Sequence, residues 1–158
     1  MGWEFEDVEK PFVAQLQKLG WVYNEGSLDD AAVTGRTNFA EVIQEGFLRA
    51  QLRVLNPGVD GAPWLDDSRL SEAVSAISCL GTHKLMEANE KATSLLIHGL
   101  TVDGLPGWDG GRGQTIRYID WETPNNNRFM VINQYRVDCP PGFNSGKAFI
   151  VPDLVLLV

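Results

Sequence analysis

The C-terminal stretch from Thr115 to Val158 constrains the fold most, because it contains three β-rich runs separated by two turn-rich breaks. The runs are Ile116 to Trp121, Arg128 to Val137 and Phe149 to Val158. The first break, residues 123–127, holds a proline and three consecutive asparagines, which favour turn conformations. This pattern predicts a three-stranded antiparallel meander.

The last of these strands carries one acidic residue, Asp153, in an otherwise apolar run. Burying a carboxylate in such a strand is costly unless a cation or a set of hydrogen-bond donors compensates its charge. Asp153 is therefore expected either to bind a ligand or to be a structural acid that backbone N–H groups or a basic side chain hold in place.

Four helices are predicted before this sheet, because apolar residues recur at helical spacing in four segments. The segments are Glu6 to Leu19, Asn38 to Leu55, Leu65 to Leu80 and Leu85 to Ile97. Asn38 and Glu41 form a capping-box pattern at the start of the second segment, and Asp66, Asp67 or Ser68 can cap the third. Residues 21–36 and the glycine-rich residues 99–113 are predicted to be connectors. The fold class is therefore α+β, with four helices on one side of a mostly antiparallel sheet.

Composition excludes several kinds of site. A chain of 158 residues with a net charge of −8 is the size of one domain and lacks the basic balance of a free-standing nucleic-acid binder. Two cysteines do not make a disulfide framework, and neither histidine has a metal ligand at the usual spacing.

The sequence shows neither a signal peptide nor an apolar stretch of membrane-spanning length, so the chain is expected to be cytoplasmic.

Some polar residues allow two interpretations. Arg36, Arg49 and Arg53 could form a phosphate-facing edge or could be ordinary solvent-facing charges. Asp120 is predicted to be structural, with its carboxylate capping the turn at Pro124 to Asn127.

Two blocks resemble a known family. The motif I-D-W-x-T-P-x-x-N-x-F-x-V-x-N-Q-Y-x-V, followed by P-D-L-V-L-L-V, resembles the N-terminal nuclease domain of type I restriction endonuclease R subunits. The earlier block V-E-x-P-F-V-x-x-L-x-x-L-G-W is similar to the first helix of the same family. The resemblance implies one restriction-endonuclease-like domain over residues 1–158, in the Pro-Asp…(Asp/Glu)-x-Lys superfamily.

The resemblance also implies a site. Asp153 would bind a magnesium ion, and Glu9 would assist from the first helix. Spacing alone favours a solvated acid at Glu9, stabilised by the helix dipole, and it is the family match on both sides of Glu9 that favours the site. In the family, a strand ending in Glu-x-Lys follows the Pro-Asp strand at once. This sequence contains no such strand after Asp153, so it is expected to be a truncated, inactive portion of the domain.

The function implied by the resemblance is cleavage of double-stranded DNA in a restriction system, beside methyltransferase and specificity subunits. ATP would act only through motor domains, whose motifs this sequence does not contain. The alternative is a non-catalytic DNA-binding, protein-binding or assembly module derived from the domain.

Because the strand edge at Leu154 to Val158 has no charge or proline that would oppose pairing, we also expect a homodimer joined there. The alternative is a monomer in which another segment of the chain covers this edge.

Overall fold

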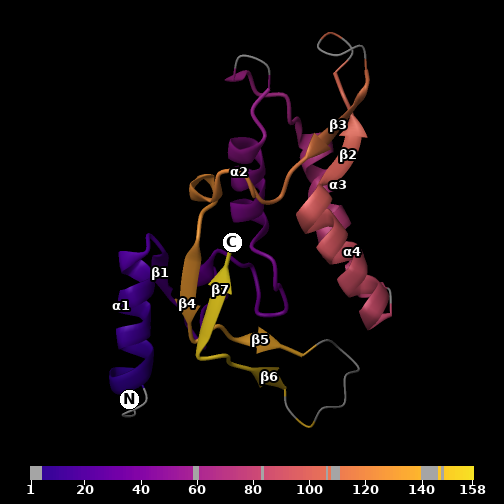
Figure 1. The fold of residues 1–158 in the computed structure, drawn as a ribbon. Coiled ribbons are helices and arrows are strands. Elements are labelled where there is room, and N and C mark those ends of the chain that lie inside the picture. Colours follow the sequence, from indigo (N-terminus) through magenta and orange to yellow (C-terminus); the bar gives the residue numbers. More distant parts are fainter. Residues whose placement is uncertain are drawn as a thin grey trace. The chain divides into compact units, whose positions relative to one another are not determined.

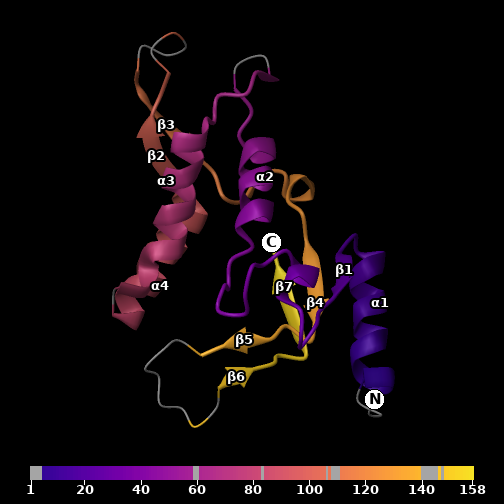
Figure 2. The same cartoon turned by 180° about the vertical axis from the view of Figure 1, so that it is seen from behind.

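The computed structural model describes residues 5–58, 61–82, 84–105, 107, 111–139, 146 and 148–158. The chain forms two compact units, shown from opposite sides in Figures 1 and 2. Unit 1 comprises Met1–Gln44 and Arg128–Val158, and unit 2 comprises Glu45–Asn127. The predicted loop at residues 139–147 lies mostly outside the described residues.

Unit 1 is built around a three-stranded sheet with the order β1-β4-β7. β1 (Val22–Glu25) pairs in parallel with β4 (Met130–Asn133), and β4 pairs antiparallel with β7 (Leu154–Leu157). β5 (Val137–Asp138) and β6 (Phe149–Ile150) form a separate antiparallel ribbon. Two short helical turns complete the unit: the π-helical η1 (Phe5–Glu9) and the 3-10 η2 (Ala31–Thr34).

One helix, α1 (Lys10–Lys18), packs on this sheet. Pro11 is tolerated because it lies in the first turn, where its missing N–H has no helical partner to lose. Val13 and Leu16 of α1 are buried against Val131 of β4. Trp21, Tyr23 and Leu154 pack around that cluster. The face of the sheet that carries Val131 is therefore the face that α1 covers.

Unit 2 contains the other three helices: α2 (Glu45–Leu55), α3 (Asp67–Ser78) and α4 (Leu85–His98). Its strands β2 (Leu100–Asp103) and β3 (Gly113–Ile116) form an antiparallel hairpin, and two 3-10 turns lie at η4 (Cys79–Thr82) and η5 (Pro124–Asn126). The buried core comprises Leu52, Trp64, Leu65, Leu70, Ala73, Val74, Val102, Ile116 and Tyr118. The Arg69 guanidinium fastens α3 to the hairpin by donating to the carbonyls of Asp103 and Gly104.

The predicted meander is wrong in its first strand. Of the predicted run Ile116 to Trp121, only Ile116 lies in a strand, β3, which pairs with β2 in unit 2. The middle and last runs do pair antiparallel, as β4 and β7. The third strand of the unit 1 sheet is β1, which lies in the stretch predicted to be an irregular connector. Its short V-Y-N-E pattern is too brief for periodicity to separate it from a loop. The glycine-rich connector also contains a strand, β2.

The second predicted helix begins seven residues later than the capping box indicates, at Glu45 instead of Asn38. The side chains of the box are used in a local turn. Asn38 Oδ1 accepts the N–H of Ala40, and the Glu41 carboxylate accepts the N–H of Thr37. Such local bonds compete with a helix for the same backbone groups. The other three helices are confirmed within a few residues, including the Asp66 cap, whose Oδ1 accepts the N–H of Arg69. The mixed architecture is consistent with the α+β class.

Candidate functional site

Glu9 lies at the end of η1, directly before α1, and is only 8% exposed. It does not cap the helix with its side chain. Burial excludes the interpretation of Glu9 as a solvated helix-start acid. The packing of α1 on the sheet explains why Glu9, directly before this helix, is buried.

The start of α1 and the end of β1 lie together. α1 has nine residues and β1 has four, so each is about 13 Å long, and the chain reverses between them at Gly20, whose φ is +90°. The electrostatics agree: burial raises the pKa of the Tyr23 hydroxyl, and the charges of Glu25 and Glu9 raise it further. The charges of Glu9 and Glu25 therefore both act on Tyr23.

The strand register extends this neighbourhood across the sheet. Glu25 pairs with Asn133, and Asn133 pairs with Leu154. Because side chains alternate along a strand, Asn133 lies on the same face as Val131, which α1 covers. Asn133 is buried, and its Oδ1 accepts the N–H of Gly26 at 3.1 Å. The start of α1, the ends of β1 and β4, and the start of β7 thus meet at one end of unit 1 (Figures 1 and 2).

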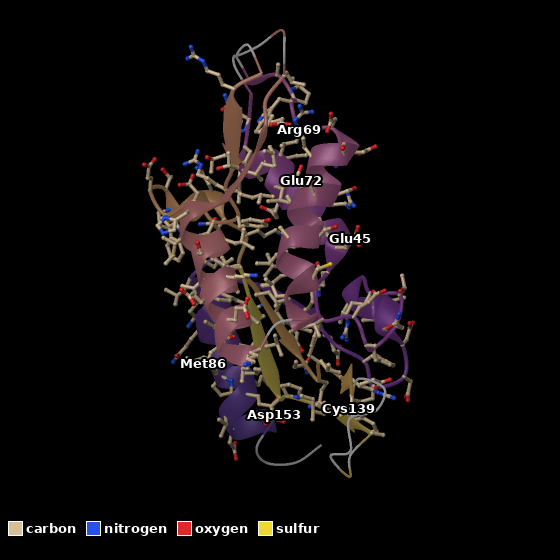
Figure 3. All side chains as sticks on the ribbon, turned by 90° about the vertical axis from the view of Figure 1, so that its right-hand side faces the viewer. Glu45, Arg69, Glu72, Met86, Cys139 and Asp153 are labelled. Carbon is tan, nitrogen blue, oxygen red and sulfur yellow. The ribbon has the colours of Figure 1, made fainter. Side chains whose placement is uncertain are left out.

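Asp153 lies at this end, directly before β7 (Figure 3). Its carbonyl accepts the N–H of Gln134 at 3.2 Å, which ties it to the residue after β4. The side chain is exposed, in a bend rather than in the middle of an apolar strand. The prediction of a buried carboxylate is therefore wrong, and so is the alternative of a buried structural acid. Pro152 and Asp153 interrupt the predicted long strand into β6 and β7.

The site offers carboxylate oxygens, which are the ligands that magnesium prefers. Glu9, Glu25 and Asp153 supply them from three segments of the chain. Within the described residues, no three His, Cys, Asp or Glu side chains lie close enough together to hold a metal ion. The part of the chain that the structure describes has no helix long and apolar enough to cross a membrane.

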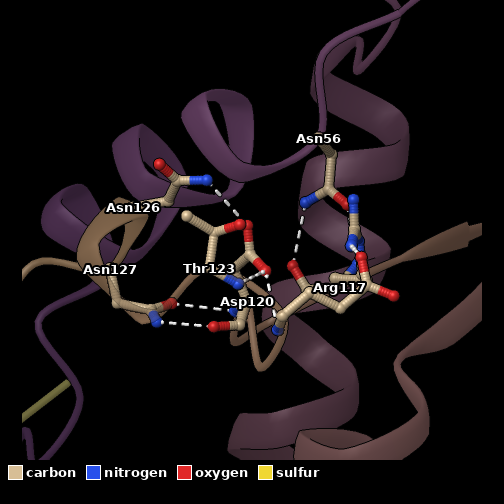
Figure 4. A network of polar contacts seen from close by, with 7 residues as sticks. Asn56, Arg117, Asp120, Thr123, Asn126 and Asn127 are labelled. Atoms are coloured by element: carbon tan, nitrogen blue, oxygen red, sulfur yellow. Dashed lines mark hydrogen bonds and ion pairs between the residues drawn. The ribbon is translucent and has the colours of Figure 1, made fainter.

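Asp120 is structural, as predicted, and belongs to unit 2 (Figure 4). Its Oδ1 accepts the N–H groups of Glu122 and Thr123, and its Oδ2 accepts the side-chain amide of Asn126. The Asn127 amide closes the turn from the other side by donating to the Asp120 carbonyl. The hydrogen bonds to the Asp120 carboxylate lower its pKa, and the bond from the Thr123 N–H makes the largest contribution.

The three arginines do not form a shared edge. Arg36 is 2% exposed and is a buried part of unit 1, so it cannot face a phosphate. Arg49 pairs with Glu45 on the next turn of α2, and Arg53 pairs with Asp67 of α3. Both exposed pairs are ordinary surface contacts.

A family model described as the type I restriction enzyme R protein N terminus matches residues 4–158 of this chain. The chain belongs to this family. The match covers both blocks that carry the sequence resemblance, including Glu9, Asn133 and Asp153.

Curated relatives agree with this membership. The chain is 28% identical over 153 residues to the type I restriction enzyme HindI endonuclease subunit of Haemophilus influenzae, with 94% of the chain covered. It is 23% identical over 153 residues to the putative type I restriction enzyme MjaIXP endonuclease subunit of Methanocaldococcus jannaschii, with 96% covered. The chain spans only 13% and 14% of the length of these two relatives. No solved structure matches it.

The sequence analysis did not identify three residues at this end of unit 1: Tyr23, Glu25 and Asn133. Asn133 is part of the N-Q-Y motif, so its place in the resemblance could have marked it. Tyr23 and Glu25 lie on β1, the strand that the sequence did not predict. Their role could not be inferred without the parallel pairing of β1 with β4.

Proposed function

We propose that this chain is part of the DNA-cleaving domain of a type I restriction R subunit, and that Glu9 and Asp153 belong to its magnesium site. The observation that carries the proposal is the meeting of the two family motifs at one end of unit 1. Glu9 lies beside β1, and the Asp153 backbone is bonded to the end of β4. Double-stranded DNA, methyltransferase and specificity subunits are the partners that this function implies.

Magnesium would polarise the scissile phosphate and lower the pKa of the attacking water. The chain's residues would hold and orient it. Asp153 is exposed, so its carboxylate is accessible to an ion that carries its own water shell. Glu9 is buried and its charge acts on Tyr23, so its carboxylate is held near β1. The additional charge of Glu25 would further favour a cation at this end of the sheet.

The test is paramagnetic broadening of backbone amides by Mn²⁺ in the isolated chain. We expect selective broadening at residues 7–10, 24–26, 133–134 and 152–154. Asp153→Asn should weaken the apparent affinity by about tenfold or more, which is about 1.4 kcal/mol for one charged ligand. Because Asp153 is exposed, this variant should keep the fold.

The matched control is Glu45→Gln, which removes an exposed carboxylate from unit 2 and should leave the broadening unchanged. Since no Glu-x-Lys occurs in these 158 residues, the same preparation should not cut linear or supercoiled DNA with Mg²⁺. Equal broadening in wild type and Asp153→Asn would contradict the proposed site and favour the non-catalytic module. Cleavage that disappears in Asp153→Asn would contradict the predicted inactivity alone.

We also propose that the isolated chain forms a homodimer through β7. Among the described strands, β7 pairs only with β4, so its other edge is open to a partner. Leu156 on that strand and Val158 directly after it are 48% and 57% exposed. An edge that is apolar and uncharged favours antiparallel pairing with the same strand of a second copy.

Sedimentation should give a dimer for the wild type and a monomer for Leu156→Lys, because a lysine on the edge opposes pairing. Val54→Lys is the matched control: it also replaces an exposed apolar residue, but in α2. A monomeric wild type whose amides at 155–157 exchange rapidly would disprove the dimer.

A further inference from the structure

Gln134 has a backbone conformation that its residue type disfavours. Its φ is +50°, and it is the one non-glycine residue with a left-handed backbone in the part of the chain that the structure describes. A side chain makes this conformation unfavourable, whereas glycine adopts it at no steric cost. Conformations of this kind persist where the surrounding structure enforces them, and they are concentrated at functional sites.

The surroundings of Gln134 enforce its conformation. Its N–H donates to the Asp153 carbonyl at 3.2 Å, and its own carbonyl accepts the N–H of Arg136 at 3.0 Å. Gly26 packs directly on the peptides on both sides of Gln134, so closely that a Cβ on Gly26 would lie 2.1 Å from the Asn133 carbonyl oxygen and 2.8 Å from the Gln134 carbonyl oxygen. These contacts use only the backbone of Gln134. A glycine at this position would make all of them.

The side chain of Gln134 therefore needs a separate explanation. None of the hydrogen bonds within the described residues uses its amide. Gln134 follows Asn133, and its N–H is hydrogen-bonded to the Asp153 carbonyl. It therefore lies at the end of unit 1 that also contains Glu9 and Glu25. An amide carries no charge, so it does not repel the anionic phosphate as a further carboxylate would. It supplies two N–H donors, and glutamine side chains contact phosphate oxygens in DNA complexes.

We propose that Gln134 is a substrate-contacting residue, whose side-chain amide donates to a phosphodiester oxygen of the DNA strand bound beside Asp153. The left-handed backbone is the cost of placing a side chain at a corner where glycine would fold more easily. This inference rests on the proposed nuclease function. It adds a phosphate-binding donor to a site that otherwise offers carboxylates.

The test uses the 158-residue chain, a 12-base-pair DNA duplex and Mg²⁺. Titrating the duplex should shift the side-chain amide resonances of Gln134 in nitrogen-resolved spectra. Gln134→Gly should weaken duplex binding by about tenfold, as expected for loss of a hydrogen bond to a charged group. The same variant should melt at or above the wild-type temperature, because glycine relieves the backbone conformation. Gln17→Ala, which removes an exposed glutamine from α1, should change neither property.

The outcomes separate the inference from the function on which it rests. If Mn²⁺ broadens the amides around Asp153 but Gln134→Gly binds the duplex as tightly as wild type, the inference fails and the metal site stands. The inference also fails, with the metal site intact, if the wild type binds the metal but no duplex. If Mn²⁺ broadening is absent or unaffected by Asp153→Asn, the proposed function fails and the inference fails with it. A lowered melting temperature in Gln134→Gly would show that the side chain serves folding, which also overturns the inference.

Discussion

Replacing Gly26 with alanine is expected to destabilise unit 1 by about 3 kcal/mol, the upper end of the usual cost of overpacking. A Cβ at this position would lie 2.1 Å from the Asn133 carbonyl oxygen and 2.8 Å from that of Gln134. Both obstacles are backbone atoms, so no side-chain rotation relieves the clash. The ends of β1 and β4 would have to separate, and the bonds from the Gly26 N–H to Asn133 would break.

The measurement is urea unfolding followed at individual tryptophan indole resonances. Trp21 packs on the unit 1 cluster and Trp64 is buried in unit 2, so each reports its own unit. Gly26→Ala should lower the midpoint at Trp21 more than at Trp64. Gly46→Ala is the matched control, because its Cβ would meet nothing within 4 Å. It lies in α2, where alanine is favoured over glycine by up to about 1 kcal/mol. If the Trp21 midpoint is the same in Gly26→Ala and wild type, the close approach of the two strands is disproved.

The loss of stability would also reach the candidate site. Gly26 joins β1 to Asn133, and Asn133 is paired with the residue that follows Asp153. Parting these strands would move Glu25 away from Asp153. We therefore expect Gly26→Ala to weaken Mn²⁺ binding, although the substitution changes no carboxylate.

The sequence predicts what is local and misses what is long-range. The turn at Asp120 and the cap at Asp66 follow from side chains that bond backbone groups within a few residues. The place of β1 depends on its pairing with β4, more than a hundred residues away, so no local pattern in V-Y-N-E reveals it. The late start of α2 has a similar cause in addition to the local bonds of the capping box. The Phe39 carbonyl accepts the N–H of Asp138, and the Val42 carbonyl accepts the Tyr135 hydroxyl, from residues more than ninety positions away.

The candidate site was predicted in part, for a related reason. Glu9 and Asp153 could be named from motifs at the two ends of the chain, but their surroundings could not. Apolar neighbours in the sequence indicated that Asp153 is buried, whereas the bend before β7 exposes it. Glu9 stands between Val8 and Lys10, which do not reveal its burial, and it is buried because the start of α1 packs beside β1.

Replacing Arg36 with methionine is the second large effect, with an expected loss of about 3 kcal/mol or more. Arg36 is 2% exposed, and its guanidinium lies 3.7 Å from the centre of the Tyr135 ring. Nε donates to the Thr34 hydroxyl, and Nη1 donates to the carbonyls of Glu41 and Arg136. Methionine would fill part of the volume but leave one buried and two partly buried acceptors without this donor, at about 1–3 kcal/mol for each one that water cannot reach.

The aromatic contacts explain why lysine should not replace Arg36 either. The Arg36 guanidinium also lies 5.6 Å from the centre of the Phe39 ring. The Arg136 guanidinium lies 4.5 Å from the centre of the same ring. Arg136 lies 4.4 Å from the ring of Phe149 on β6. These contacts between arginine guanidinium groups and aromatic rings connect residues 34–41 to the segment after β4. Its planar cations can stack on rings while donating in fixed directions, and an ammonium group cannot do both.

We therefore expect Arg36→Lys to lose about 2 kcal/mol, less than Arg36→Met because the charge remains near Glu41. Arg53→Met is the matched control: that arginine is 48% exposed in an ion pair with Asp67, so its loss should change stability by about 0.5 kcal/mol or less. Unfolding in urea at the Trp21 resonance measures all three variants. If Arg36→Lys is as stable as wild type, charge alone suffices at this position. The stacked geometry would then contribute nothing to the stability of unit 1.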